Sequence, residues 1–313
     1  MSRNFAKISI KPRYRTAFAL FFCALCAASV LLFPTLAAES LARSCKRFYL
    51  RLLPALFPMM ILSRRMAAYM PVPHGKAAKL FCRLSGLSEN ELPLFVIGLL
   101  CGYPLPAVLA AKEYENGGCD AEEAARRAAL FDNASPGFLI AFAGSGLLGS
   151  VKYGIFLYTA QVLSVLCTAR LFPAKIRSKK TAARQSANTL AEDIRQSARL
   201  LTELFAFTAA FSLLADFIGA VLRFFHAPSC LTGFAAGLLE ITDGCVMLAG
   251  GTVPKKALCL MLPFLSGMGG ASVLLQVRAA LPPPLSIRPY LAMRPVTAVL
   301  MTACFQIMTA VSP

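Results

Sequence analysis

Long apolar stretches separated by short basic segments dominate this 313-residue chain. Residues 16–38 carry no charge, and 153–169, 204–222 and 296–311 are apolar with at most one ionisable residue inside each. A helix that crosses a bilayer needs about 20 mostly apolar residues. The pattern therefore predicts an all-α polytopic membrane protein of about seven spans, with 16–38 retained as the first transmembrane helix.

One apolar stretch, 92–111, is interrupted where an ordinary span would continue. Pro104 and Pro106 lack backbone donors and obstruct a continuous helix, while Gly102 permits a tight reversal. Irregular backbone is tolerated at membrane depth only where it is buried in protein or lines a cavity. We predict a re-entrant hairpin with its tip at Gly102, Tyr103 and Pro104. A kinked but complete span is the alternative.

Composition and charge support a membrane location. The chain is 57% hydrophobic and 15% charged, with a mean hydropathy of +0.63 and a net charge of +17. The Lys and Arg residues cluster between the apolar stretches, as the positive-inside rule predicts. If 92–111 returns to its starting side, the basic clusters fall on one side, which places the N-terminus in the cytoplasm. Because no basic face alternates with aromatic residues, we expect no nucleic-acid partner.

The order of segments is repeated. A span near 48–68, the interrupted segment around Gly102 and a broken helix at 133–137 are followed by a second span, a segment at 237–244 and a second broken helix around Gly269. The crossing at 153–169 lies between them, so the repeats would have inverted orientations, as in many secondary transporters. The predicted divisions are 1–47 (basic segment and first helix), 48–172 (first repeat plus linking span), 173–199 (basic cytoplasmic loop), 200–280 (second repeat) and 281–313 (C-terminal helix).

Four segments resemble one known family. They are CGYPLPAVLAAKEYENGG at 101–118, FDNASPGFLIAFAGSGLLGS at 131–150, GLLEITDG at 237–244 and GGASVLLQV at 269–277. Together they resemble the YlbJ-type sporulation integral membrane proteins of the nucleoside-recognition, or Gate-domain, family. The resemblance implies an inner-membrane protein made during endospore formation, in the forespore or mother-cell membrane, related to the gate of concentrative nucleoside transporters. The chain departs from the family pattern at Pro106 and Val108.

Two acidic residues inside an apolar stretch are the main candidates for a binding site. Ionisable groups are costly at membrane depth, so Glu240 and Asp243 are expected to contact a solute, ion or proton. The alternative is that they cap a helix end near water or pair with Lys255 or Lys256. Their spacing of three places both on one helical face.

The broken helices supply the remaining candidates. Pro136 near a helix start would direct free amides into a cavity, where Asn133 and Ser135 could bind a polar solute. The alternative is that Asp132 or Asn133 only caps the next helix. Gln276, Gly269 and Gly270 are the counterparts in the second repeat, where the glycines could equally serve close helix packing.

These residues predict transport or gating of a small polar solute, nucleoside-like or ion-coupled, and no enzyme activity. The alternative is a non-transporting scaffold for assembly of the spore cortex or envelope.

One short motif matches an element of intramembrane proteases, namely Glu122, Glu123 and Arg126. Because no histidine lies in a span to complete that site, a helix capped by Asp120 is the simpler interpretation. The scattered cysteines and two histidines predict no metal or cofactor. The expected partners are the lipid bilayer, the solute or ion, and either a second copy of the chain or other spore membrane proteins.

Overall fold

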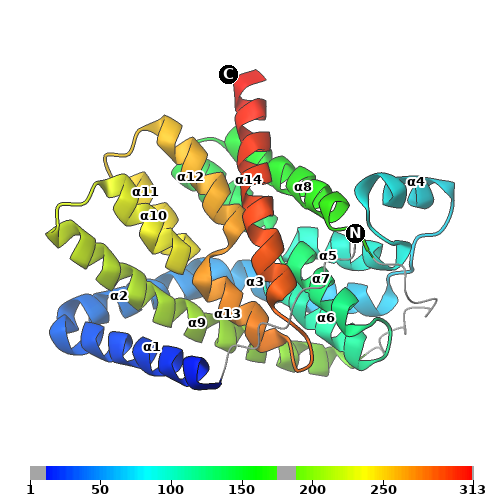
Figure 1. The fold of residues 1–313 in the computed structure, drawn as a ribbon, viewed down its shortest axis with the longest axis horizontal. Coiled ribbons are helices and arrows are strands. Elements are labelled where there is room, and N and C mark those ends of the chain that lie inside the picture. Colours follow the sequence, from blue (N-terminus) through cyan, green and yellow to red (C-terminus); the bar gives the residue numbers. More distant parts are fainter. Residues whose placement is uncertain (1–11, 175–187, 312–313) are drawn as a thin grey trace.

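The structure is a computed structural model that describes residues 12–174 and 188–311. Within these ranges the chain forms helices and no strand (Figure 1), which confirms the all-α prediction. The helices are α1 Pro12–Leu32, α2 Pro34–Arg47, the π-helix η1 Phe48–Leu52, α3 Leu53–Tyr69, α4 Lys76–Ser85, the 3₁₀-helix η2 Glu89–Glu91, α5 Leu92–Cys101, α6 Leu105–Glu115, α7 Ala121–Phe131, the π-helix η3 Gly137–Leu147, α8 Val151–Leu171, α9 Leu190–Phe224, α10 Ser229–Leu239, α11 Ile241–Gly250, α12 Lys255–Met268, α13 Gly270–Ala280 and α14 Arg288–Val311.

Several of these helices are long and apolar enough to cross a membrane. In the described residues four helical stretches meet this criterion, namely Val151–Leu171, Leu190–Phe224, Lys255–Ala280 and Arg288–Val311. Two sharply bent pairs bring the number to six if each bent pair is one span. The chain is therefore a multi-pass membrane protein, with fewer continuous spans than the seven expected. The difference arises because other apolar stretches are divided into the short helices 137–147, 229–239 and 241–250.

The expected first span is divided as well. The chain bends by 111° between Cys23–Leu32 and Pro34–Leu50, so 16–38 does not form one straight helix. The reason is Pro34, which lacks a backbone donor and starts α2 directly after Phe33 leaves the helical conformation. The part of the chain before residue 12 lies outside the described residues.

A long antiparallel pair forms one side of the molecule. The helix that runs through α2, η1 and α3 lies along α9, with Arg43 beside Asp216, Phe48 beside Phe205 and Arg65 beside Asp193. Rising numbers on one partner match falling numbers on the other, so the two run in opposite directions. We call the end at Arg65 and Asp193 the basic end and the end at Phe224 the far end.

The interrupted segment around Gly102 forms a hairpin of α5 and α6, called hairpin one. Along α5, Glu91 pairs with Arg126, Gly98 packs against Phe131, and the Tyr103 amide donates to the Asn133 carbonyl at 2.9 Å, so α5 runs parallel to α7. The chain reverses at Gly102, whose φ is +75°, a conformation that favours glycine. The end of α6 then returns to α7.

The return of α6 is shown by the charged residues at the base of the hairpin. Glu113, near its end, lies 2.6 Å from Arg127, which is also 3.7 Å from Glu91 at the start of α5. Both ends of the segment therefore lie at the same arginine at the basic end. This confirms a hairpin with its tip at residues 102–104 over a kinked continuous span.

Helices α10 and α11 form a second, tighter hairpin, called hairpin two. Its two helices touch where Gly237 meets Gly244, and its tip is Glu240. Its open end lies at the far end, since Gly251 is next to Ser229 and Met247 of α11 is next to Gly219 of α9. The two hairpins therefore enter from opposite ends, and their tips approach each other inside the molecule.

Each half of the chain also contains a broken helix and a closing helix. The first break separates α7 from η3, and the second falls at Gly269 between α12 and α13. The closing helices α8 and α14 pack together, joined by the Thr168 and Thr297 hydroxyls at 3.0 Å. The sequence predicts 153–169 as a span that links the repeats and 281–313 as a separate C-terminal helix. In the structure, the helices formed by these two segments follow the broken helix of their half in the same way.

Candidate functional site

A cavity of about 50 Å³ lies where the two hairpin tips meet. Hairpin one contributes its tip, hairpin two contributes its tip and first turn, and the long antiparallel pair supplies apolar walls. The polar side chains that line it are Tyr103, Ser135, Thr208, Glu240, Thr242 and Gln276, and the other lining residues are Leu52, Leu56, Gly102, Phe138, Leu204, Ile241 and Val273. Of the predicted site and hairpin residues, the cavity thus brings together Gly102, Tyr103, Ser135, Glu240 and Gln276.

Glu240 is 3% exposed and occupies the break between the two helices of hairpin two. Its backbone is extended there, which leaves the first amides of α11 without helical partners. The Oε2 atom accepts a hydrogen bond from the Asp243 amide at 2.8 Å. The capping role considered from the sequence is therefore realised, but inside the protein and beside the cavity.

Asp243 points away from the cavity. Its Oδ1 atom pairs with Arg47 at the end of α2, and not with Lys255 or Lys256 as one sequence interpretation held. A second pair, Arg43 with Asp216 at 2.9 Å, follows one turn earlier on α2. Since a buried carboxylate is costly without a partner, these arginines compensate the acidic groups of α9 and α11.

Asn133 also lies outside the cavity, and both polar atoms of its side chain have hydrogen-bond partners elsewhere. Its Oδ1 accepts from Arg294 at 2.8 Å and its Nδ2 donates to the Leu130 carbonyl at 2.7 Å. Ser135, in contrast, lines the cavity, and its Oγ accepts from the Phe138 amide at 3.2 Å. The helix cap at this break is therefore Ser135, and not Asp132 or Asn133 as considered above.

The second broken helix places its residues differently. Gln276 donates through Nε2 to Ser272 at 3.1 Å, while its Oε1 atom has no hydrogen-bond partner in the described part of the chain. Gly270 packs on the carbonyls of residues 237–239, and Gly269 lies beside the Tyr290 hydroxyl. Pro104 begins hairpin one's second helix and Pro136 precedes η3, so neither lines the cavity.

The residues that support the first break were not among the candidates predicted from the sequence. Gln161 of α8 accepts from the Ala134 amide at 3.1 Å and donates to its carbonyl at 2.9 Å. Arg294 of α14 is 1% exposed, contacts Asn133 and lies 5.4 Å from the Tyr290 ring. Asp132 is fully buried and faces Arg294. The available signal was a polar residue inside an apolar stretch, as for Gln161 and Glu240, or directly beside one, as for Arg294.

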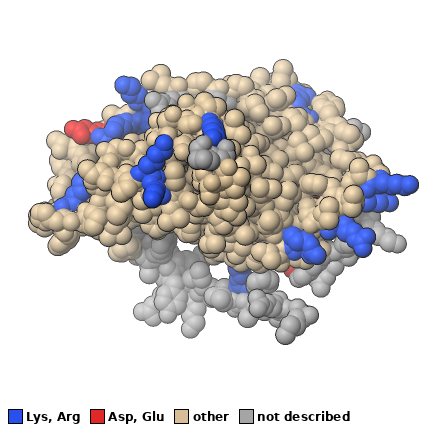
Figure 2. All heavy atoms as spheres, turned by 90° about the horizontal axis from the view of Figure 1, so that it is seen from above, with Lys and Arg blue, Asp and Glu red and all other residues tan. Residues whose placement is uncertain are grey.

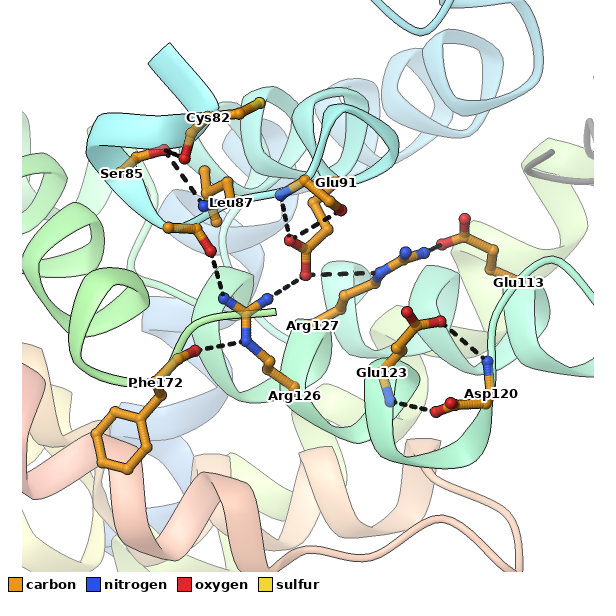
Figure 3. A network of polar contacts seen from close by, with 12 residues as sticks. Cys82, Ser85, Leu87, Glu91, Glu113, Asp120, Glu123, Arg126, Arg127 and Phe172 are labelled. Carbon is orange, nitrogen blue, oxygen red and sulfur yellow. Dashed lines mark hydrogen bonds and ion pairs between the residues drawn. The ribbon is translucent and has the colours of Figure 1, made fainter. Parts of the chain in front are cut away.

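A network of charged residues holds the base of hairpin one (Figure 3). Glu91, which is 1% exposed, pairs with Arg126 and approaches Arg127, and Arg127 also pairs with Glu113. Asp120 accepts from the Glu123 amide at 2.8 Å, which confirms the predicted helix start. Arg126 also donates to the Phe172 carbonyl at 2.7 Å, which ties the network to α8.

Together, the fold and the cavity define a class: a polytopic α-helical membrane protein in which two hairpins enter from opposite ends and meet at a small polar cavity. In the described ranges no group of three or more His, Cys, Asp or Glu is placed to bind a metal ion. Comparisons with protein-family models, curated proteins and solved structures found no significant match to this chain.

Proposed function

We propose that this protein transports or gates a small polar solute or ion across a membrane, and that the cavity between the hairpin tips is its binding site. The observation that carries the proposal is the position of Glu240 beside the cavity at the tip of a hairpin. Secondary transporters bind substrates near the midplane, at the interface of inverted repeats and at broken helices. A buried carboxylate in a membrane protein marks solute or ion pathways by default.

The size of the cavity bears on the substrate. A volume of about 50 Å³ accommodates an ion or a very small solute, whereas sites for drug-sized ligands occupy about 300–1,000 Å³. A nucleoside-like solute would therefore require the hairpin tips to move apart. The lining combines a carboxylate, hydroxyls and a free amide oxygen, a set that suits a cation or a hydrogen-bonding solute.

The proposed setting follows from the resemblance described above. We place the protein in the inner membrane of a spore-forming cell, with the basic end toward the cytoplasm, because Lys and Arg accumulate on that side. Its role there would be transport needed for spore formation. A scaffold for envelope assembly has no use for a polar cavity between two hairpins, so the cavity favours transport.

Transport is tested with the purified chain in liposomes. Ion gradients are applied and the charge movement is recorded on a supported membrane, and uptake of labelled uridine is measured in parallel. Glu240→Gln keeps an oxygen that can cap α11 but removes the charge. We expect flux to fall about tenfold or more, as for loss of a charged contact worth at least 1.4 kcal/mol.

The matched control is Glu203→Gln, which removes an exposed carboxylate from the same protein and should leave flux unchanged. Wild-type flux in Glu240→Gln would exclude the cavity as the binding site. Absence of any flux in the wild type, with heat-resistant spores still lost when Glu240 is replaced in cells, would favour the scaffold.

A further inference from the structure

A second and larger cavity lies at the basic end, away from the hairpin tips. Its volume is about 550 Å³, and it is formed by α4, the η2 turn, α7 and the end of α8. The lining residues are Lys79, Cys82, Arg83, Gly86, Leu87, Ser88, Glu89, Asn90, Gly118, Glu123, Arg127, Arg170, Pro173 and Ala174. The proposed transport function does not use this cavity.

The charges that face this cavity are mainly positive, and three of the four lining cations are unpaired in the described part of the chain. Lys79 and Arg83 of α4 and Arg170 of α8 are exposed and form no ion pair in the described part of the chain. The two lining carboxylates are already engaged: Glu89 lies 2.7 Å from His74, and Glu123 accepts from the Asp120 amide at 3.2 Å. The cavity therefore presents three cations that no carboxylate of the described residues pairs with, and an anion could contact all three.

The backbone around the cavity is firmly placed. Gly86 ends α4 with a φ of +75° and packs directly on the backbone of Ala169 and Arg170. The Ala174 amide then donates to the Gly86 carbonyl at 3.3 Å. These contacts fix α4 against the end of α8, so the cations of both helices stay together without a ligand.

Apolar side chains border the cations. On α4, Leu80 and Leu84 are 59% and 69% exposed, and Leu171 at the end of α8 is 61% exposed. A short helix with one apolar and one basic face lies in the membrane interface, where its apolar side chains reach the acyl chains. Figure 2 shows basic side chains on the side of the molecule at which Figure 1 places α4.

We propose that this cavity binds the phosphate headgroup of an anionic phospholipid. Lys79, Arg83 and Arg170 contact the phosphate oxygens, for which guanidinium groups offer paired donors, while Leu80, Leu84 and Leu171 contact the acyl chains. Basic pockets at the cytoplasmic ends of membrane helices hold anionic headgroups in this way. The exposed leucines favour a lipid over a soluble phosphate compound, because a soluble anion gains nothing from them.

Native mass spectrometry of the detergent-purified chain tests the proposal. We titrate phosphatidylglycerol and, separately, phosphatidylcholine of the same chain length. The triple variant Lys79→Gln, Arg83→Gln, Arg170→Gln should bind phosphatidylglycerol about tenfold or more weakly, with its weak phosphatidylcholine binding unchanged. The matched control is Arg195→Gln with Arg199→Gln, two exposed arginines of α9 with weak ion pairs, and it should bind like wild type.

Two further experiments distinguish a bound lipid from a bound soluble anion. Leu80→Gln with Leu84→Gln should weaken phosphatidylglycerol binding while binding of glycerol phosphate stays the same. If glycerol phosphate or inorganic phosphate competes at the concentration at which the lipid binds, the site takes a soluble anion and the proposal is wrong. Equal binding of phosphatidylglycerol by the triple variant and wild type, with both folded by thermal melting, also overturns it.

Discussion

Hairpin one and hairpin two are both pairs of short helices joined at a sharp turn, but they are held by different forces. At the base of hairpin one, four buried or half-buried charged groups, Glu91, Glu113, Arg126 and Arg127, join both helices to α7. At the base of hairpin two, none of the neighbouring charged side chains that the structure describes, Arg223, Lys255 and Lys256, forms a salt bridge. Hairpin two is instead closed along its length by the contact of Gly237 with Gly244.

This difference concerns the ion pairs that each hairpin would break if it moved. Separating hairpin one from α7 would expose or unpair buried charges, at about 3–5 kcal/mol for a broken pair. Among the ion pairs of the described residues, moving hairpin two as a rigid unit breaks one, Asp243 with Arg47, close to its tip. If the protein gates a solute as we propose, the ion pairs favour hairpin two as the element that moves.

The largest expected effect is that the bases of the two hairpins are accessible from opposite sides of the membrane. In a background without native cysteines, Asn90→Cys and Asn116→Cys flank hairpin one, and Ser229→Cys and Thr252→Cys flank hairpin two. A membrane-impermeant maleimide should label the first pair from one side and the second pair from the other, because the hairpins enter from opposite ends. Labelling of all four from one side would refute the inverted arrangement.

The next largest effect is a difference in labelling rate between a cysteine at the base of hairpin one and a cysteine at the base of hairpin two. Burial raises the pKa of the Cys119 thiol, at the base of hairpin one, to about 12. Only the thiolate reacts, so at pH 8 its reactive fraction is about a thousandfold below that of a thiol with a pKa of 9. Cys230, which is half-buried at the base of hairpin two, should be labelled much more readily than Cys119. Rapid labelling of Cys119 in the folded protein would mean that the base of hairpin one opens.

Glu91→Ala should destabilise the protein by about 3–5 kcal/mol, because it leaves two arginines buried without their common partner. Chemical or thermal unfolding in detergent measures the loss. Glu203→Ala removes an exposed partner of Arg199 and should change stability by less than about 0.5 kcal/mol. Similar losses in the two variants would show that the charged network does not hold hairpin one.

A smaller loss of stability is expected from a substitution in hairpin two. A Cβ at Gly244 would collide with the backbone of Gly237, so Gly244→Ala should cost about 1–3 kcal/mol through overpacking and should shift the tip that carries Glu240. Gly250→Ala adds the same methyl group in open space on the same helix and serves as its control. If both variants unfold like the wild type, hairpin two is not closed by glycine packing.

Much of the architecture could be predicted from the sequence because it depends on local chemistry. Gly102 and Pro104 interrupt an apolar run, and the structure turns there, since neither residue supports a continuous helix. Pro34 carried the same signal inside 16–38, yet the absence of charge favoured one straight span, and the chain bends by 111°. Segment length alone thus overestimated the number of continuous spans.

The partners of the buried charges could not be predicted in the same way. Arg47 reaches Asp243, and Arg294 reaches Asn133, across separations of well over a hundred residues in sequence. A single sequence indicates that a carboxylate inside an apolar stretch needs compensation, but it does not identify the cation that provides it. Gln161 likewise serves the Ala134 backbone only because α8 packs beside the first break.

By itself, the sequence determined the membrane class, the helical content, the tip of hairpin one and the polar residues that merit attention, because each follows from hydropathy or from the backbone limits of glycine and proline. The tertiary structure alone decided which of those residues share a cavity. Ser135, Glu240 and Gln276 line it, whereas Asn133 and Asp243 turn away to pair with arginines. That division depends on how the two halves fit together, and buried charges are satisfied by whichever helix the packing brings within reach.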